Sequence, residues 1–451
     1  MRLAKARVHF IGIGGIGMCG LAELLHNLGA QGTGSDASEN TQTLRLKEIG
    51  ISVAKGHDEK NLGECEVVVY SSAVKEDNVE FAAARRRKIP LIRRAEALAD
   101  IMSLKRGIAV AGTHGKTTTT SLTASIFLHV KLDPTIVVGG RLDVIKSTAQ
   151  LGQGEWLIAE ADESDGSFTH LSPEVVIITN IDNDHLDHYK SVQNLERAFL
   201  DFALRIPFYG VAIVCGDDPR LKKVFAQFGK RWISYGLDPD NDYVLKRVDD
   251  QWLVAHDGKP LGHMRPAMPG QHNALNSLAA ILAAQQAGVG FNAAAAAIAG
   301  FGGVDRRFQH KASIRGIDFY DDYGHHPTEV RAVLAGVKER FPERRLVTVF
   351  QPHRYSRTQL CWDDFLTCFK DTDVLFVLDI YAAGESPIAG VDAARLVKEI
   401  DHPQGIFLSR EKDPDLNQVR EMLKPGDILL TLGAGDISKL GEKMTEAFVK
   451  G

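Results

Sequence analysis

The 451-residue sequence has no run of about 18 apolar residues, the length that a helix needs to cross a bilayer. It reaches a glycine-rich segment by Gly12, too early for the apolar core of a signal peptide. Its five cysteines show neither metal-ligand spacing nor an even disulfide framework, which is typical of a reducing compartment. The net charge is only -5, so a polyanionic nucleic acid is not an expected partner. These absences predict a cytoplasmic protein without membrane insertion.

The residues that are present predict an α/β fold. Apolar residues make up 44% and charged residues 25%, ordinary values for a globular chain, and the length suits about three domains. Buried-strand patterns alternate with helical ones, which is typical of mostly parallel sheets. We expect three consecutive domains over residues 1–104, 105–310 and 311–451. The first and third are predicted to be Rossmann-like, and the second to carry the mostly parallel sheet of a P-loop ATPase.

A glycine loop at the start of the second domain predicts a phosphate site. It follows the apolar segment 107–111 and precedes a helical pattern, so its backbone N–H groups would converge on phosphate oxygens. The loop consists of Gly112, Thr113, His114, Gly115, Lys116, Thr117 and Thr118. Lys116 would reach the terminal phosphates and Thr117 would hold magnesium. The spacing is shorter than in the common pattern, which has a glycine where this chain has Val110.

A second glycine loop opens the first domain. The expected strand 8–11 is followed by glycines at positions 12, 14, 15 and 17, and Asp36 lies 19 residues after the last of them. This spacing fits a dinucleotide-binding fingerprint with its ribose-binding acid. Ser71 and Ser72 follow another expected strand, 66–70, where open parallel sheets bind ligands. Alone, the pattern predicts only a diphosphate at a helix start.

Two acidic segments in the second domain suggest a metal site. Glu160, Asp162, Glu163 and Asp165 fall within six residues, and such crowding is costly unless cations neutralise it. The spacing does not show which of them binds metal. His185 lies among aspartates after the expected strand 175–180. The local sequence favours neither of two interpretations of His185, a metal ligand or a residue of a charged loop.

Polar clusters also follow strands in the third domain. Arg354 and Arg357, three residues apart and next to His353, are suited to grip a carboxylate. Arg306, Arg307 and the segment 321–327 add further polar groups, and one shared cleft explains them better than separate surface loops. At the start of the helix expected over 273–287, Asn273 and Asn276 suit an adenine base, but asparagine is equally common as a helix cap.

Together these motifs resemble the Mur ligase family of peptidoglycan synthesis over essentially the whole length, and within it the members that add L-alanine. The segments that carry the resemblance are 12–18, 112–120, 160–165, 179–189, 272–276, 321–329 and 350–358.

The resemblance implies a role for each matching residue. It makes Lys116, His185 and Arg307 catalytic. It implies ATP binding by residues 112–118 with Asn273, Asn276, Arg307 and Asp322. It selects Glu160, rather than Glu163, to bind magnesium with Thr117 and His185, at two ions in all. It implies binding of the UDP part of UDP-N-acetylmuramate by Gly12, Gly14, Gly15, Gly17, Asp36, Ser71 and Ser72. It assigns the amino-acid pocket to Tyr323, His325, His353, Arg354 and Arg357.

The implied reaction is ATP-driven amide formation between UDP-N-acetylmuramate and L-alanine, by a monomer or a homodimer. The nearest alternative is a ligase of the same family that adds a recycled tripeptide. Two alternatives from other classes are a nicotinamide dehydrogenase, suggested by the first domain alone, and a regulatory nucleotide sensor without catalysis. Relatives that add later residues use a carbamylated lysine after the His185 segment. This chain has no lysine between Lys190 and Lys222, as in the alanine-adding members.

Overall fold

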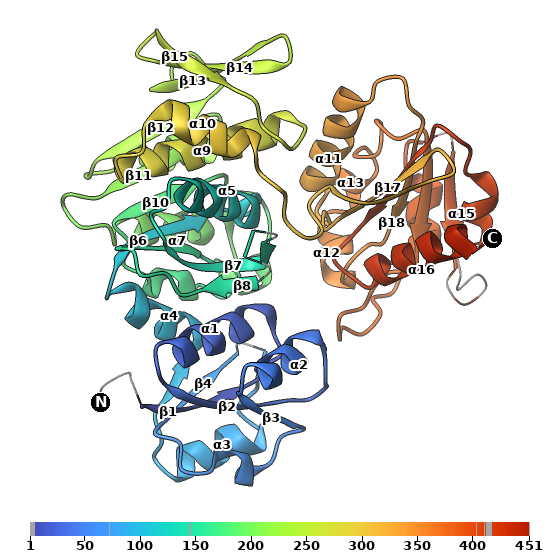
Figure 1. The fold of residues 1–451 in the computed structure, drawn as a ribbon. Coiled ribbons are helices and arrows are strands. Elements are labelled where there is room, and N and C mark those ends of the chain that lie inside the picture. Colours follow the sequence, from blue (N-terminus) through green and yellow to red (C-terminus); the bar gives the residue numbers. More distant parts are fainter. Residues whose placement is uncertain are drawn as a thin grey trace. The chain divides into compact units, whose positions relative to one another are not determined.

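The computed structural model describes residues 5–71, 73–142, 144–145, 147–402, 404–409, 411 and 417–450. Its chain carries three α/β sheets and divides into two compact units (Figure 1). The first unit comprises residues 1–267 and 275–302, and the second comprises 268–274 and 303–451. The predicted fold class is confirmed, since three mostly parallel sheets follow one another along the chain. Among the described helices, none has both the length and the apolarity to span a membrane.

The first sheet has five parallel strands in the order β3-β2-β1-β4-β5. The strands are β1 (Arg7–Ile11), β2 (Gln31–Asp36), β3 (Ser52–Lys55), β4 (Val67–Tyr70) and β5 (Leu91–Arg93). The helices are α1 (Ile16–Asn27), α2 (Thr41–Glu48), η1 (Glu59–Leu62), α3 (Val79–Arg86) and α4 (Arg94–Met102). Figure 1 shows α1 and α2 on one face and α3 on the other. The strand order reverses at β1, so ligands are expected at its carboxyl end, which is where Gly12 lies.

The second sheet has ten strands in the order β15-β14-β13-β12-β11-β10-β6-β9-β7-β8. Its strands are β6 (Arg106–Ala111), β7 (Thr135–Leu142), β8 (Ser147–Gln150), β9 (Trp156–Glu160), β10 (Val175–Ile178), β11 (Val211–Cys215), β12 (Trp232–Gly236), β13 (Tyr243–Val248), β14 (Gln251–His256) and β15 (Lys259–Met264). The part from β13 to β7 is parallel, whereas β8, β14 and β15 pair antiparallel. The helices are α5 (Lys116–His129), η2 (Ser167–His170), α6 (Leu186–Tyr189), α7 (Val192–Ala203), α8 (Pro219–Phe225), α9 (Gln271–Gln286) and α10 (Phe291–Ala299).

The third sheet has six strands in the order β16-β17-β21-β18-β19-β20, of which only β16 pairs antiparallel. They are β16 (Gln309–Ile314), β17 (Ile317–Asp322), β18 (Leu346–Phe350), β19 (Val374–Leu378), β20 (Gly405–Leu408) and β21 (Ile428–Leu432). The helices are α11 (Pro327–Arg340), α12 (Tyr355–Leu360), α13 (Trp362–Phe365), α14 (Ala393–Glu399), α15 (Asn417–Met422) and α16 (Ile437–Lys450). A hydrophobic cluster lies on each face of this sheet. Every residue of β18, β19 and β21 is buried, and each large aliphatic side chain there contributes roughly 1.5–3 kcal/mol by leaving water.

Candidate functional site

The glycine loop between β6 and α5 is held tightly by its neighbours. Gly112 has φ 132°, and a Cβ there would lie 2.0 Å from the hydroxyl oxygen of Thr179. Gly115 has φ 83°, and a Cβ there would lie 2.8 Å from Oδ1 of Asn276 in α9. Both positions therefore need glycine, for backbone conformation and for space. The contact also brings Asn276, one of the residues expected on the ATP side, against the loop.

The Lys116 ammonium has three oxygen acceptors. It donates to the carbonyl oxygens of Gly112 at 2.7 Å and Thr113 at 3.0 Å, and to Glu163 Oε1 at 2.8 Å. Glu163 is fully buried, and burial raises the pKa of its carboxyl to about 7 although the Lys116 charge opposes the rise. Glu163 Oε2 has no hydrogen-bond partner among the described residues. A buried acceptor of this kind is costly, so it marks a position that suits a cation.

The candidate metal ligands fall into two neighbouring pairs. Thr117 Oγ1 donates to Glu160 Oε1 at 3.0 Å, and Glu160 Oε2 accepts from the Gly139 N–H at 2.7 Å. His185 adopts a left-handed backbone with φ 57°, and its Nε2 lies 3.7 Å from Glu163 Oε1. Hydroxyl and carboxylate oxygens are the ligands that magnesium prefers, and Glu163 Oε2 offers a further one. The oxygens of Thr117, Glu160 and Glu163 therefore fit magnesium, and His185 Nε2 lies beside them.

The segment after β10 anchors the phosphate loop from one side. The His114 N–H donates to Asn180 Oδ1 at 2.8 Å, and the Thr179 hydroxyl donates to the His114 carbonyl oxygen at 2.5 Å. The His114 ring nitrogen Nε2 lies 3.0 Å from Asp182 Oδ2. His114 thus fixes the loop to the end of the next strand, and the other expected loop residue, Thr118, is buried in the first turns of α5.

The glycine loop of the first sheet lies at the carboxyl ends of β1, β2 and β4. The Gly14 N–H donates to Asp36 Oδ2 at 2.8 Å, so the expected ribose-binding acid contacts the loop. A Cβ on Gly12 would lie 3.3 Å from the Cβ of Ser71. Gly15 is the N-cap of α1 and Gly17 lies in its first turn. The structure therefore brings these predicted residues together, whereas Ser72 lies outside the described residues.

In the second unit, aromatic rings and arginines gather after β17. The guanidinium carbons of Arg306 and Arg307 lie 5.0 and 5.2 Å from the ring centre of Tyr323. The Tyr323 ring lies 5.2 Å from the ring of His325. These cation–π contacts place both guanidinium groups against the Tyr323 ring.

The ends of β17 and β18 meet through two histidines. The ring centres of His325 and His353 are 5.8 Å apart, and Arg357 Nη1 lies 3.3 Å from His353 Nδ1. Burial lowers the pKa of His353 to about 4, and the charges of Arg357 and Arg354 add to the effect. Arg354 has a left-handed backbone, and its Nε lies 4.0 Å from Glu385 Oε1. A neutral histidine beside arginines suits an anionic ligand such as an amino-acid carboxylate.

The remaining ATP-side candidates of the second unit are Asp322 and Asn273. Asp322 accepts N–H groups from Phe308 and Gly324, both at 2.7 Å. Burial raises the pKa of Asp322 to about 6, with Arg307 opposing the rise. The Asn273 amide donates to the Pro269 carbonyl oxygen at 2.7 Å, which is a helix-start contact.

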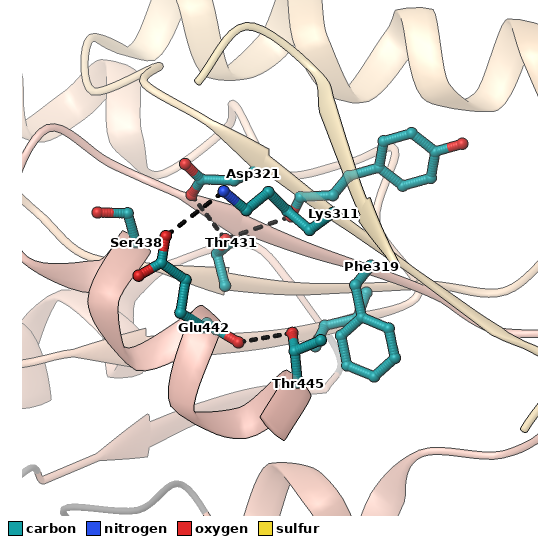
Figure 2. A pocket seen from close by; sticks show the side chains of 10 residues that line it. Lys311, Phe319, Asp321, Thr431, Ser438, Glu442 and Thr445 are labelled. Carbon is teal, nitrogen blue, oxygen red and sulfur yellow. Dashed lines mark hydrogen bonds and ion pairs between the residues drawn. The ribbon is translucent and has the colours of Figure 1, made fainter. Parts of the chain in front are cut away.

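A small pocket lies behind this cluster, between the third sheet and α16 (Figure 2). Thr431 donates to Asp321 Oδ1 at 2.7 Å, and the Lys311 ammonium lies 3.4 Å from Glu442 Oε1. The other oxygen of Asp321 accepts from Arg306 Nε at 3.0 Å. Burial raises the pKa of Asp321, and Arg306 opposes the rise. Of the segment 321–327, which the sequence places in a third-domain cleft, Asp321 lines this pocket, and its carboxylate holds Arg306 beside Tyr323.

Two further contacts escaped the sequence analysis. The spacing of the four acids does not rank them, and the resemblance selects Glu160 rather than Glu163; only the fold shows that Glu163 pairs with Lys116. Gly139 gives no local signal, since its contact with Glu160 depends on the pairing of β7 with β9.

Comparison with known proteins covers the whole chain. Three family descriptions match in succession: Mur ligase family, catalytic domain, over residues 7–106; Mur ligase middle domain over 110–284; and Mur ligase, glutamate ligase domain, over 306–435.

Individual relatives match at full length. The UDP-N-acetylmuramate--L-alanine ligase of Bdellovibrio bacteriovorus is 56% identical over 98% of each chain, and that of Syntrophotalea carbinolica is 49% identical over 97% of each. The crystal structure of the UDP-N-acetylmuramate-alanine ligase of Thermotoga maritima superposes with a TM-score of 0.83 at 27% identity, covering 98% of this chain and 99% of that one. A murein peptide ligase from Psychrobacter arcticus shares the fold, with a TM-score of 0.73 at 24% identity over 98% of each chain. On this agreement of sequence and structure along its length, the chain belongs to the Mur ligase family.

Proposed function

We propose that this chain joins L-alanine to the lactyl carboxylate of UDP-N-acetylmuramate in an ATP-dependent reaction of peptidoglycan precursor synthesis. The products are UDP-N-acetylmuramoyl-L-alanine, ADP and phosphate. One observation carries the proposal: eight full-length relatives, 45–56% identical, are named UDP-N-acetylmuramate--L-alanine ligase.

The first step transfers the γ-phosphoryl group of ATP to the lactyl carboxylate. A carboxylate oxygen forms a bond to the γ-phosphorus, the bond to the bridging oxygen breaks, and ADP leaves. Residues 112–118 bind the phosphates, and Lys116 turns from its three present acceptors toward the transferring group. Thr117, Glu160 and His185 would hold magnesium, which offsets phosphate charge when bound. Asn273, Asn276, Arg307 and Asp322 complete the ATP side.

The second step forms the amide. The neutral amine of L-alanine attacks the carbonyl carbon of the acyl phosphate, the tetrahedral intermediate expels phosphate, and the amine loses a proton. Tyr323, His325, His353, Arg354 and Arg357 bind the amino acid. The arginines suit its carboxylate, and the low pKa of His353 keeps that ring neutral at pH 7, so that it adds no positive charge to those of Arg354 and Arg357.

The first domain binds the UDP part of the sugar nucleotide. Gly12, Gly14, Gly15 and Gly17 present the start of α1 to the diphosphate, with Asp36, Ser71 and Ser72 beside it. The domain boundaries 1–104, 105–310 and 311–451 belong to this proposal, as do a cytoplasmic location and a monomeric or homodimeric state.

The alternatives are less well supported. A murein peptide ligase shares the fold at 24% identity, whereas the named alanine ligases share about half of their residues with this chain. Because the chain belongs to the Mur ligase family, the first glycine loop is expected to bind a sugar nucleotide and not a nicotinamide dinucleotide. Membership of a ligase family also argues against a regulatory sensor, which would catalyse no reaction.

The test is a substrate panel. The protein is given ATP, magnesium and UDP-N-acetylmuramate with L-alanine, L-serine, glycine or the recycled tripeptide, and both phosphate release and product mass are measured. We expect product with L-alanine at the highest kcat/KM. A preference for the tripeptide would assign the chain to peptide recycling, and no product with any of them would refute the ligase proposal.

The variant Lys116→Ala tests the role of the lysine in the first step. It should lose product formation by about a thousandfold or more, in the range of a lost charge-stabilising group at a reacting centre. Its fold is checked by near-UV circular dichroism, because the lysine makes its contacts at the loop and not in the core. Substantial residual activity in a folded Lys116→Ala protein would contradict the assigned role.

A further inference from the structure

Three consecutive residues at the end of β17 bind the loop that leads into β16. Asp321 Oδ2 accepts from Arg306 Nε at 3.0 Å. Asp322 Oδ2 accepts from the Phe308 N–H at 2.7 Å. The Tyr323 N–H donates to the Arg306 carbonyl oxygen at 2.7 Å. The loop is therefore fastened to the strand end that leads into the candidate amino-acid pocket.

Arg306 is held in this loop by its backbone and by its guanidinium. Its backbone has φ 59°, a conformation that few residues other than glycine adopt. Its guanidinium donates through Nε to Asp321 and through Nη2 to the carbonyl oxygen of Gly433, which follows β21. The guanidinium carbon lies 5.0 Å from the ring centre of Tyr323. Because the guanidinium is planar and two of its nitrogens are bonded, its plane is fixed where it meets the Tyr323 ring.

The carboxylate of Asp321 is itself held from the opposite side (Figure 2). Asp321 on β17 is paired with Thr431 on β21, and the Thr431 hydroxyl donates to Asp321 Oδ1 at 2.7 Å. The Asp321 side chain is only 3% exposed, so a rotation would leave a buried oxygen without a donor. Asp321 is therefore a rigid support for the guanidinium of Arg306.

We propose that Asp321 and Arg306 are positioning residues for the binding of L-alanine, and that they act by holding the Tyr323 ring in place. Asp321 orients the guanidinium of Arg306, and the guanidinium lies against the ring. Neither side chain has to touch the amino acid. This inference rests on the proposed function, because it takes Tyr323 as part of the amino-acid pocket.

The Tyr323 ring connects this pair to the other candidate site residues. Its centre lies 5.2 Å from the ring centre of His325 and 5.2 Å from the guanidinium carbon of Arg307. Without Arg306, one of the groups that restrict the ring is lost, and other rotamers become accessible to it. L-alanine is small and makes few contacts, so its binding depends strongly on the shape of the pocket.

The test measures steady-state kinetics of the full chain for wild type, Asp321→Asn, Arg306→Gln and the variant that combines both changes. In each single variant we expect the KM for L-alanine to rise about tenfold, as for loss of one supporting hydrogen bond. The KM values for ATP and UDP-N-acetylmuramate should stay within about twofold, and kcat within about threefold. Because Asp321 acts through Arg306, the combined variant should match Arg306→Gln within about twofold. Multiplication of the two single effects, to about a hundredfold, would overturn this order of action.

Asp318, at the opposite end of β17, supplies the matched control. It pairs with Arg344 as Asp321 pairs with Arg306, so Asp318→Asn should lower the thermal stability of the third domain and leave the KM for L-alanine unchanged. An equal rise of that KM in Asp318→Asn would mean that lost stability alone explains the effect, and would overturn the positioning role.

An unchanged KM for L-alanine in either folded single variant would overturn the proposal as well. Arg306→Gln decides the question if Asp321→Asn does not fold, because the Arg306 side chain is 23% exposed and can be replaced without a buried cavity. A wild-type protein that releases no phosphate in response to L-alanine would instead count against the proposed function itself.

Discussion

Replacement of Glu80 by glutamine should destabilise the first domain by roughly 3 kcal/mol at neutral pH. Glu80 lies on α3 with no exposed side-chain surface, and four groups donate to its carboxylate. The donors are His9 Nε2 at 3.2 Å, the Ser35 hydroxyl at 2.5 Å, Asn61 Nδ2 at 2.7 Å and the Asp58 N–H at 3.1 Å. The network therefore ties α3 to β1, β2 and η1.

The magnitude follows from the pKa of this carboxyl. Burial alone would raise the pKa of Glu80, but the hydrogen bonds lower it from 4.5 to about 2. A difference of about 2.5 between the two values corresponds to roughly 3 kcal/mol in favour of the ionised form in the folded protein. Glutamine keeps the shape of the side chain but loses its charge. Its NH₂ group would also face N–H or O–H donors that the carboxylate of Glu80 accepts.

The sign of the pH dependence follows from the same two values. The unfolded chain takes up the proton near pH 4.5 and the folded chain near pH 2, so this stabilisation is complete above about pH 5 and is lost as the pH falls toward 2. Wild type and Glu80→Gln should therefore differ most above pH 5, and the difference should narrow from pH 5 downward.

The assay has to report on the first domain. The four tryptophans, at positions 156, 232, 252 and 362, all lie outside the first sheet and its helices, so their fluorescence does not report on this network directly. Hydrogen exchange of peptides from β1, β2 and α3 gives the opening free energy of the first domain. Glu64→Gln is the matched variant, because Glu64 is 87% exposed and its ion-pair partner in the described part of the chain is Arg7 at the surface, where ion pairs contribute little. A Glu80→Gln effect below about 0.5 kcal/mol, or one that does not change with pH, would refute the reasoning.

Two further variants test the other candidate sites. Gly112→Ala should destabilise the central domain by about 2–4 kcal/mol and weaken ATP binding, because its Cβ would fall 2.0 Å from the Thr179 hydroxyl at a φ of 132°. Tryptophan fluorescence during denaturation measures the loss of stability, and Gly229→Ala, with open space at that position, is the neutral control. Equal stability of the two variants would contradict the steric argument. Arg357→Gln should raise the KM for L-alanine about tenfold or more and that for ATP less than twofold, as expected for loss of a charged contact to a carboxylate. Steady-state kinetics measure both KM values, with Arg395→Gln as the control because Arg395 pairs with Glu399 on the surface. A larger rise in the KM for ATP than in that for L-alanine would contradict the pocket assignment.

Much of the fold was predictable from buried-strand patterns. The apolar runs at 346–350, 374–378 and 428–432 coincide with β18, β19 and β21, because a strand buried on both faces is a continuous apolar run between polar residues. The segment 216–270 predicts no strand by this criterion, although β12 to β15 extend the central sheet there. Residues of β15 are mostly exposed or half-buried, so they lack the apolar run that marks a central strand.

The site was predictable in its parts but not in its pairings. Residue types after strand ends indicated phosphate, metal and carboxylate chemistry, since carboxyl ends of parallel strands share one edge. Glu163 accepts a hydrogen bond from Lys116, whereas Glu160 accepts one from Thr117. This pairing depends on how the backbone turns between residues 160 and 163, which a sequence pattern does not show. The positive φ of His185 and of Arg354 was equally invisible, because few residues other than glycine adopt it and residue type alone does not show which ones do.

The contact between Gly139 and Glu160 limits how this enzyme can change. The donor is a backbone N–H, which every amino acid but proline supplies, while a Cβ at position 139 would lie 2.7 Å from the carboxylate oxygens. The hydrogen bond therefore does not depend on the side chain at position 139, and only the space beside Glu160 restricts which residue can stand there. A compound that accepts the same N–H would contact a group that side-chain substitution does not delete, and any larger residue at 139 would disturb Glu160 as well. Escape from such an inhibitor by changes at position 139 would therefore displace the carboxylate of Glu160, the proposed magnesium ligand.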